Sequence, residues 1–170
     1  MPSGNIYKYM LGHYDIYIPS VMFKRDFILE KKILFNVEYD LIEEFDFFLK
    51  ILKDTKALYI NECLANWRVH EESNTWKKYH LFSIEREHFL NNLNLTSDDE
   101  KKFKYEIQQI KNLNLFQESI FKWRNNNNYT ARKTILPIIF SRLKYFFVFL
   151  LMFFPYKYIK HLISFYKKLP

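Results

Sequence analysis

The chain has 170 residues, of which 49% are hydrophobic and 20% aromatic, enough apolar material for one domain with a buried core. Only two glycines occur, which excludes a glycine-rich phosphate-binding loop, and the single cysteine, Cys63, excludes an internal disulfide and a multi-cysteine zinc site. The net charge of +7 is uneven, because residues 119–170 hold ten Lys or Arg and no acid, whereas residues 1–118 hold sixteen basic and nineteen acidic residues. A mildly acidic body with a basic C-terminal region predicts an anionic partner, either a membrane or a nucleic acid.

The sequence carries no sign of export or of membrane crossing. Its first residues, MPSGNIYKYMLGHYD, lack the basic start and apolar core of a secretory signal. The longest charge-free apolar run, residues 145–156, is twelve residues long, where a membrane span needs about twenty. Together with the lone cysteine, these features predict a cytoplasmic protein that lies peripherally on the inner face of the cell membrane.

The first predicted elements are a strand and a short helix. Residues 16–23, IYIPSVMF, are β-branched and aromatic and predict a strand, with Pro19 indicating its start or a sheet edge. Residues 24–32, KRDFILEKK, have the spacing of a short helix. Asp40 is expected to cap the next helix, with Glu43 completing a capping box.

That next helix has one apolar stripe at helical spacing, and two short strands are expected after it. The stripe consists of Leu41, Phe45, Phe48, Leu49 and Leu52. The strands are predicted over residues 57–60, ALYI, and residues 64–70, LANWRVH, with a turn between them.

The rest of the chain is predicted to be helical. Helices are expected from about residue 75 to 93 and from a capping box at Ser97 and Glu100 to about residue 123. The asparagine run at 125–128 indicates a loop and a boundary. Beyond it, the basic and aromatic tail is predicted to form two helices separated at Pro155.

Three acids stand at the head of the striped helix, in EEFDFFLKI. Glu43 and Asp46 share a face with Lys50, away from the stripe, which suits first-turn acids and an ion pair. Glu44 instead lies at the margin of the stripe, about 40° from Phe48. A carboxylate beside apolar side chains is partly desolvated, which favours its protonated form and suits general-base chemistry. Spacing alone leaves capping and catalysis both open.

The order of these motifs resembles bacterial family 2 glycosyltransferases. The segment EEFDFFLK at 43–50 is similar to the EDxDLWLRL helix of that family, and WRVH at 67–70 is similar to its YRxH-like strand end. SVMF at 20–23, with the basic pair after it, precedes them in the same order. The resemblance covers about residues 12–95.

The resemblance implies an α/β fold, or α+β as an isolated fragment: the second half of a GT-A glycosyltransferase domain followed by a helical C-terminal region. The implied parts are residues 1–95 as the acceptor-side half of the catalytic domain, residues 96–124 as a helical extension, and residues 129–170 as a basic amphipathic tail. The implied reaction moves a sugar from a nucleotide-sugar donor to a hydroxyl of a polysaccharide or glycolipid acceptor.

The resemblance also implies roles for particular residues and a divalent metal. The implied site consists of Glu44 as the general base with Glu43 beside it, Asp46, Trp67 and Arg68 as substrate-binding residues, and His70 as a metal ligand. Mg²⁺ or Mn²⁺ would neutralise the leaving diphosphate, which these hard cations bind through oxygen.

The sequence departs from the family pattern at two points. The second acid of the family's pair is usually Asp, whereas this chain has Glu44, one methylene longer. The chain also contains no Asp-x-Asp, the metal motif of the family's donor-binding half. The chain is therefore expected to be a fragment, a split partner or a trimmed form, and to be inactive by itself.

The tail predicts a membrane-surface element. Ile159, Leu162, Ile163, Tyr166 and Leu169 fall on one side of a helix, flanked by lysines and preceded by FFVFLLMFF. The alternative is that these residues only cover the core. A non-catalytic membrane-binding remnant is therefore a second functional hypothesis, and a nucleic-acid-binding protein a third, disfavoured because the basic residues alternate with bulky apolar ones.

Overall fold

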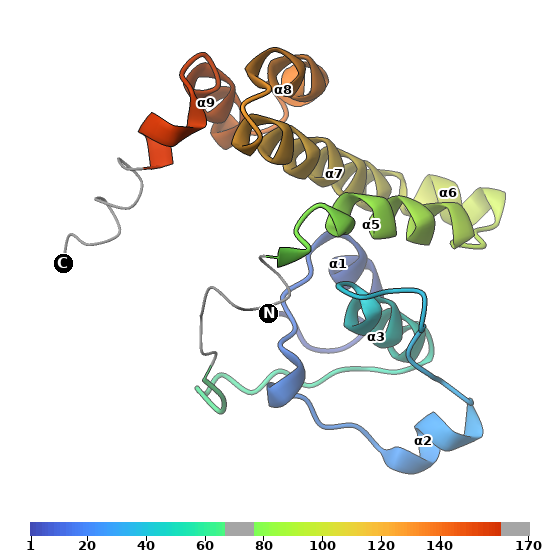
Figure 1. Ribbon diagram of the computed structural model, residues 1–170. Coiled ribbons are helices and arrows are strands. Elements are labelled where there is room, and N and C mark those ends of the chain that lie inside the picture. The colour runs from blue at the N-terminus through green and yellow to red at the C-terminus, as the bar shows by residue number, and fades with distance from the viewer. Residues whose placement is uncertain (67–76, 161–170) are drawn as a thin grey trace. The chain divides into compact units, whose positions relative to one another are not determined.

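The computed structural model describes residues 1–66 and 77–160, and Figure 1 shows its path. The chain divides into two compact units, Met1–Ile110 and Lys111–Pro170. The elements in chain order are α1 (Tyr7–Gly12), η1 (Ile18–Ser20), α2 (Arg25–Glu30), α3 (Glu43–Asp54), α5 (Leu81–Asn92), α6 (Ser97–Lys102), α7 (Lys104–Arg124), α8 (Asn128–Ile135), η2 (Leu136–Ile138) and α9 (Leu143–Leu151).

The core of the first unit is built around α3. The predicted stripe is confirmed, because Phe45, Phe48, Leu49 and Leu52 are buried and Leu41 is half-buried. Phe47 and Ile51 are buried too, so α3 is covered on more than one face. The short helix α1 packs against α3 and contributes Met10 and Leu11 to the same core. The burial of these aromatic and aliphatic side chains is the main force that holds the unit together.

The start of α3 is held by a carboxylate from a helix that follows much later in the sequence. Glu85 of α5 is buried and accepts hydrogen bonds from the backbone amides of Asp40, Leu41 and Ile42 at 3.0, 3.0 and 3.2 Å. It thereby satisfies amides just ahead of α3 that would otherwise lack partners. The predicted Asp40 cap is therefore wrong: the Asp40 carboxylate instead pairs with Lys78 at 2.6 Å.

The predicted α/β fold, with α+β as its form in an isolated fragment and the second half of a GT-A domain as its architecture, is wrong. The described residues form helices and no sheet, and their one β-bridge joins Gly4 to Ala57, with backbone N–O distances of 2.7 and 2.9 Å. Gly4 adopts φ +97°, a left-handed conformation that glycine accepts without a steric penalty.

The described residues of the three predicted strands do not form strands, because strand formation depends on pairing with a second segment. Residues 16–23 include the 3₁₀ turn Ile18–Ser20, whose Pro19 has no amide to donate to a sheet. Residues 57–60 pair with the chain only through Ala57, and residues 64–66 form no strand. A β-branched segment becomes a strand only when a neighbouring strand pairs with it. Residues 67–70 of the third prediction lie outside the described residues.

Most of the predicted helices are present, although their first and last residues differ from the predicted ones. The short helix predicted over 24–32 is confirmed as α2, and the helix predicted over 75–93 appears as α5 within the described residues. The capping box of α6 lies one residue earlier than predicted. Thr96 accepts a hydrogen bond from the Asp99 amide at 3.1 Å, and the Asp99 carboxylate accepts one from the Thr96 amide.

The second unit contains the end of α7 together with α8, η2 and α9. Its core consists of Trp123, Ala131, Ile135, Ile138, Ile139, Tyr145, Met152 and Ile159. The Trp123 indole donates to the Phe154 carbonyl at 2.9 Å, and the Arg132 guanidinium donates to the Met152 carbonyl at 2.9 Å. The predicted tail is therefore part of a folded core as far as Ile159, which was expected on its exposed apolar face and is buried instead. The other residues of that face, Leu162, Ile163, Tyr166 and Leu169, lie outside the described residues. None of the helices in the described ranges is both long and apolar enough to cross a bilayer.

Candidate acid–base site at the start of α3

Two glutamates in the first turn of α3 lie close to the phenol of Tyr14. The ring of Tyr14 packs edge-on against Phe45 at 5.4 Å between centroids, which holds the phenol beside α3. Its hydroxyl is near enough to Glu44 to donate to that carboxylate and shift its pKa, and Glu43 acts on the same phenol through its charge. The site therefore combines two carboxylates and one hydroxyl on a fixed helix end.

Burial raises the pKa of the half-buried Glu44 above its ordinary range. The hydrogen bond from Tyr14 opposes that rise, and the neighbouring charge of Glu43 adds to it. The pKa of Tyr14 is raised as well, first by burial and then by the two carboxylates, so the phenol stays protonated and acts as a donor. Glu44 is therefore a carboxylate with an increased tendency to accept a proton.

Glu43 adds an unsatisfied acceptor to this site. Its Oε2 atom is buried and has no hydrogen-bond partner among the residues that the structure describes. An unpaired buried carboxylate oxygen is costly, so such atoms usually accept from an ordered water or from a bound ligand. A ligand hydroxyl placed beside Glu43 and Glu44 would supply such a donor.

Asp46, predicted to bind substrate, has a different environment from the two glutamates. It forms the predicted ion pair with Lys50, whose Nζ lies 2.5 Å from Oδ2. Asp46 lies about 200° around the helix from Glu44 and lines a cavity on that other side. There the pKa of Tyr39 is raised, mainly by burial and then by the negative charge of Asp46. Glu43 and Glu44 therefore lie beside Tyr14, whereas Asp46 lies in the cavity wall on the other side of α3.

The remaining predicted site residues, Trp67, Arg68 and His70, lie outside the described residues. The metal prediction gains no support from the rest: no group of three His, Cys, Asp or Glu side chains gathers within residues 1–66 and 77–160. Mg²⁺ is commonly held by one or two carboxylates together with substrate phosphates, so the metal stays a prediction.

Sequence reasoning missed Tyr14 and the whole of α1. Tyr14 follows α1 and reaches Glu44 across some thirty residues of chain, a contact that no local pattern encodes. A signal for α1 did exist, since Ile6, Met10 and Leu11 are buried at i, i+4 and i+5.

Comparisons with known proteins found no matching family model, no matching curated protein and no matching solved structure.

Proposed function

We propose that the chain takes part in glycosyl transfer, with Glu44 as the general base that removes the proton from an acceptor hydroxyl. The observation that carries the proposal is the position of Glu44, half-buried near Tyr14 and beside the buried Oε2 atom of Glu43, a burial that raises the pKa of Glu44. The motif order described from the sequence supplies the reaction class. A positioned general base contributes roughly 10²–10⁴-fold to a rate.

In the proposed step, the acceptor oxygen forms a bond to the anomeric carbon of a nucleotide sugar. Its proton passes to Glu44, and the bond to the diphosphate breaks with its electron pair on the leaving nucleotide. Tyr14 donates to the Glu44 carboxylate and so fixes the oxygen that faces the acceptor, and Glu43 accepts from a second acceptor hydroxyl. No step runs through a metal, and Trp67, Arg68 and His70 keep their roles only as predictions.

The chain is proposed to serve a bacterial polysaccharide or glycolipid pathway. With no Asp-x-Asp in its sequence, it depends on further residues to hold the donor diphosphate, so the 170 residues alone should turn over no nucleotide sugar.

A genetic complementation tests the role of Glu44 in the encoding organism. Deletion of the gene should change the surface glycans, as measured by mass spectrometry, and the wild-type chain should restore them. Glu44→Gln should fail to restore them although it keeps size and hydrogen bonding, while Asp46→Asn restores them. Restoration by a stably expressed Glu44→Gln would refute the proposal.

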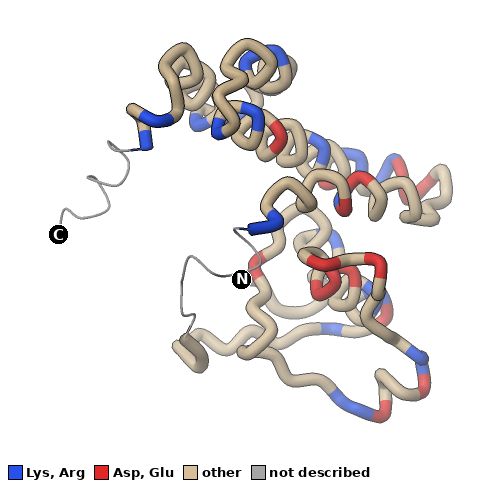
Figure 2. Tube along the Cα trace, in the orientation of Figure 1, with Lys and Arg blue, Asp and Glu red and all other residues tan. Residues whose placement is uncertain are grey.

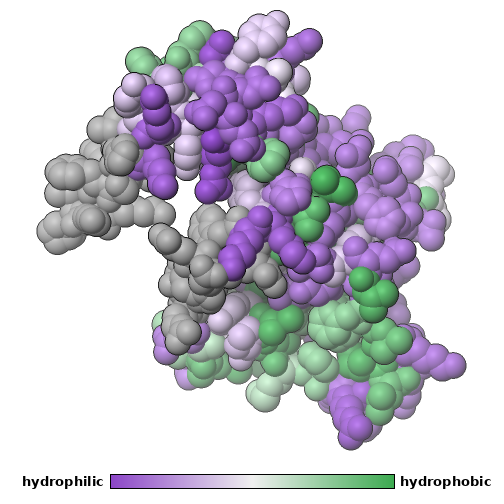
Figure 3. Space-filling view, in the orientation of Figure 1, coloured by the Kyte–Doolittle hydropathy of each residue, from purple (hydrophilic) through white to green (hydrophobic). Residues whose placement is uncertain are grey.

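A second proposed function, peripheral binding to the inner membrane face, is favoured by the exposed apolar surface of α9. Its sequence, LKYFFVFLL, is almost wholly apolar, yet Tyr145 is its only buried side chain. Leu143 and Phe147 of α9 are 73% and 55% exposed, and Phe140, which precedes α9, is 87% exposed. Further exposed apolar residues of the second unit are Leu136, Leu150, Leu151, Phe153, Phe154 and Tyr158. Figure 3 shows green atoms at the upper edge, where α8 and α9 lie.

Charge favours a lipid surface as the partner of α9. No acid follows Glu118, whereas Arg142, Lys144 and Lys157 accompany the exposed apolar residues, and Figure 2 shows blue segments without red ones along α8 and α9. Basic residues near an anionic leaflet each contribute about 1 kcal/mol, and aromatic side chains favour the interfacial zone.

Vesicle sedimentation tests this second function. The protein should pellet with vesicles containing phosphatidylglycerol, less with phosphatidylcholine alone, and less at high salt. A triple change of Phe140, Leu143 and Phe147 to Ser should weaken binding at least about 100-fold, since each buried side chain contributes roughly 1.5–3 kcal/mol. Val37→Ser, at a position of the first unit that is 97% exposed, is the control and should leave binding unchanged. Unchanged binding by the triple variant would exclude α9 as the membrane contact.

A further inference from the structure

A cavity of about 760 Å³ lies in the first unit, against the side of α3 that carries Asp46. Its volume falls in the range of about 300–1,000 Å³ that is typical of small-molecule sites. The walls come from the start of the chain and α1, the segment before α3, α3 itself, the end of α5, and α6, so the cavity belongs to the fold and not to one loop.

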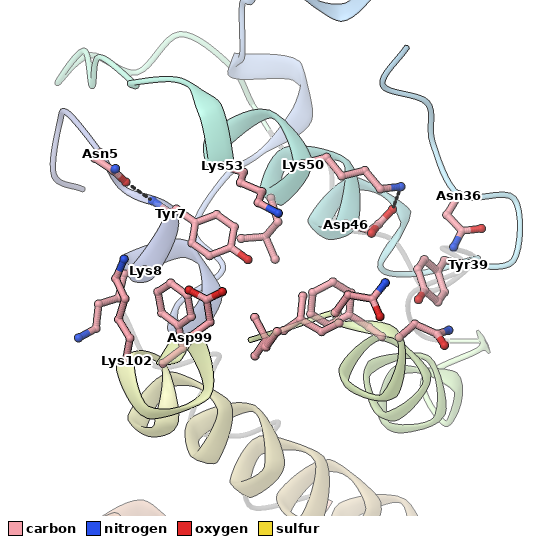
Figure 4. A pocket seen from close by; sticks show the side chains of 17 residues that line it. Asn5, Tyr7, Lys8, Asn36, Tyr39, Asp46, Lys50, Lys53, Asp99 and Lys102 are labelled. Carbon is pink, nitrogen blue, oxygen red and sulfur yellow. Dashed lines mark hydrogen bonds and ion pairs between the residues drawn. The ribbon is translucent and has the colours of Figure 1, made fainter. Parts of the chain in front are cut away.

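The side chains in its wall are aromatic, amide and basic. Tyr7, Tyr39, Phe89 and Phe103 supply aromatic surface, and Asn5, Asn36, Asn92 and Asn94 supply amides. Figure 4 shows Tyr7 and Lys53 between two polar ends, one with Lys8, Asp99 and Lys102 and the other with Asn36, Tyr39, Asp46 and Lys50. Aromatic faces with amide and phenol groups around them suit a molecule that has both apolar faces and many hydroxyls.

The charges of the wall are unbalanced toward positive. Lys50 is neutralised by Asp46 at 2.5 Å, and Lys8 lies 3.7 Å from Glu106. The Asp99 carboxylate is occupied by Thr96, which donates through its hydroxyl at 2.9 Å. Lys53 and Lys102 form no ion pair with any described residue, and the Lys102 ammonium lies 5.1 Å from the centre of the Phe103 ring.

We propose that this cavity binds a saccharide that carries an anionic group, with Lys53 and Lys102 pairing with the anion. The aromatic rings contact the apolar face of the sugar, and the asparagine amides and tyrosine hydroxyls bond its hydroxyls. A phosphate or a carboxylate on the sugar meets the same two ammonium groups, because lysine binds either as a point charge. The proposal names a ligand for residues other than Glu44, and its failure leaves the general-base proposal standing.

Calorimetric titration of the full chain at low salt tests this assignment. The probes are glucose 6-phosphate, glucuronic acid, glucose, inorganic phosphate and uridine 5′-monophosphate. We expect saturable binding of one or both anionic sugars, at least about tenfold tighter than that of glucose or phosphate, because sugar and anion contacts act together. Binding of one anionic sugar and not the other identifies which anion is recognised.

Matched variants locate the binding. Lys53→Gln and Lys102→Gln should each weaken it about fivefold or more, whereas Lys56→Gln, an exposed lysine outside the cavity, and Glu44→Gln should leave it unchanged. Four results would overturn the proposal: no saturable binding of either anionic sugar, equal binding of phosphate, tighter binding of the nucleotide, or unchanged affinity in both lysine variants.

Discussion

At the scale of single residues, the environment of Glu44 decides its chemistry. The helical wheel predicts its place at the margin of the apolar stripe, and the structure agrees by leaving it half-buried in the first turn of α3. The helical wheel does not predict the nearby phenol of Tyr14, because Tyr14 lies in the segment after α1. Nor does it predict the unsatisfied oxygen of Glu43, because that depends on tertiary packing. Helical periodicity predicts the face of the helix on which a side chain lies, but not the residues of other segments that contact it.

A stability measurement tests the raised pKa of Glu44. The pKa of Glu44 is higher in the folded protein than in the unfolded chain, so protonation of Glu44 stabilises the fold. This stabilisation appears as the pH falls through the folded pKa and is absent at neutral pH, where Glu44 is ionised. Glu44→Gln removes the buried charge and should therefore raise the melting temperature at pH 7. The advantage should shrink as the pH falls through the raised pKa of the folded protein and should be gone below about 4.5, the unfolded value. An advantage independent of pH would contradict the burial of an ionised Glu44.

At the scale of elements, local patterns located most helices and mislocated their ends. The stripe of α3 and the Asp46–Lys50 pair follow from i, i+3 and i+4 spacing, which depends on the helix alone. The cap of α3 does not, because Glu85 reaches its amides from α5. The capping box of α6 was one residue off, since Thr96 and Ser97 are chemically equivalent candidates.

Replacing Glu85 tests the cap supplied by α5. Glu85→Gln keeps one acceptor oxygen and loses the charge, so at least one of the amides of Asp40, Leu41 and Ile42 should lose its bond. The free energy of unfolding should fall by about 1–3 kcal/mol, measured by urea denaturation. Glu87→Gln, an exposed position on the same helix, should change it by less than about 0.5 kcal/mol. Equal effects of the two changes would mean that the cap is not structural.

At the scale of the whole molecule, the sequence misled most about fold class. Residues 16–23 and 57–60 have strand-forming side chains, but pairing is a property of two segments, and among the described residues only Gly4 and Ala57 pair. The charge asymmetry, by contrast, was visible from the sequence, as it depends on composition alone. The cavity beside α3 could not be foreseen, because its wall draws on five parts of the chain.

The second unit provides a test of whether the basic tail is core or appendage. Tyr145 is buried and stacks on Phe116 at 4.6 Å between ring centres. Tyr145→Ala should cost about 3–5 kcal/mol, and hydrogen exchange should show faster exchange of the α8 and α9 amides. Tyr129→Ala, at a position 70% exposed, should leave those amides unchanged. Protection of α8 and α9 that survives Tyr145→Ala would contradict the packing described here.

An NMR titration of the Glu44 side-chain carboxyl, assigned by the loss of its signal in Glu44→Gln, tests whether Glu44 is prepared to accept a proton. The midpoint should lie above the ordinary glutamate pKa of 4.5, and it should rise further in Tyr14→Phe, because the hydrogen bond that lowers it is removed. A midpoint at or below 4.5 in the wild-type protein would show that Glu44 is an ordinary solvated carboxylate at the head of a helix, and not a base prepared to accept a proton.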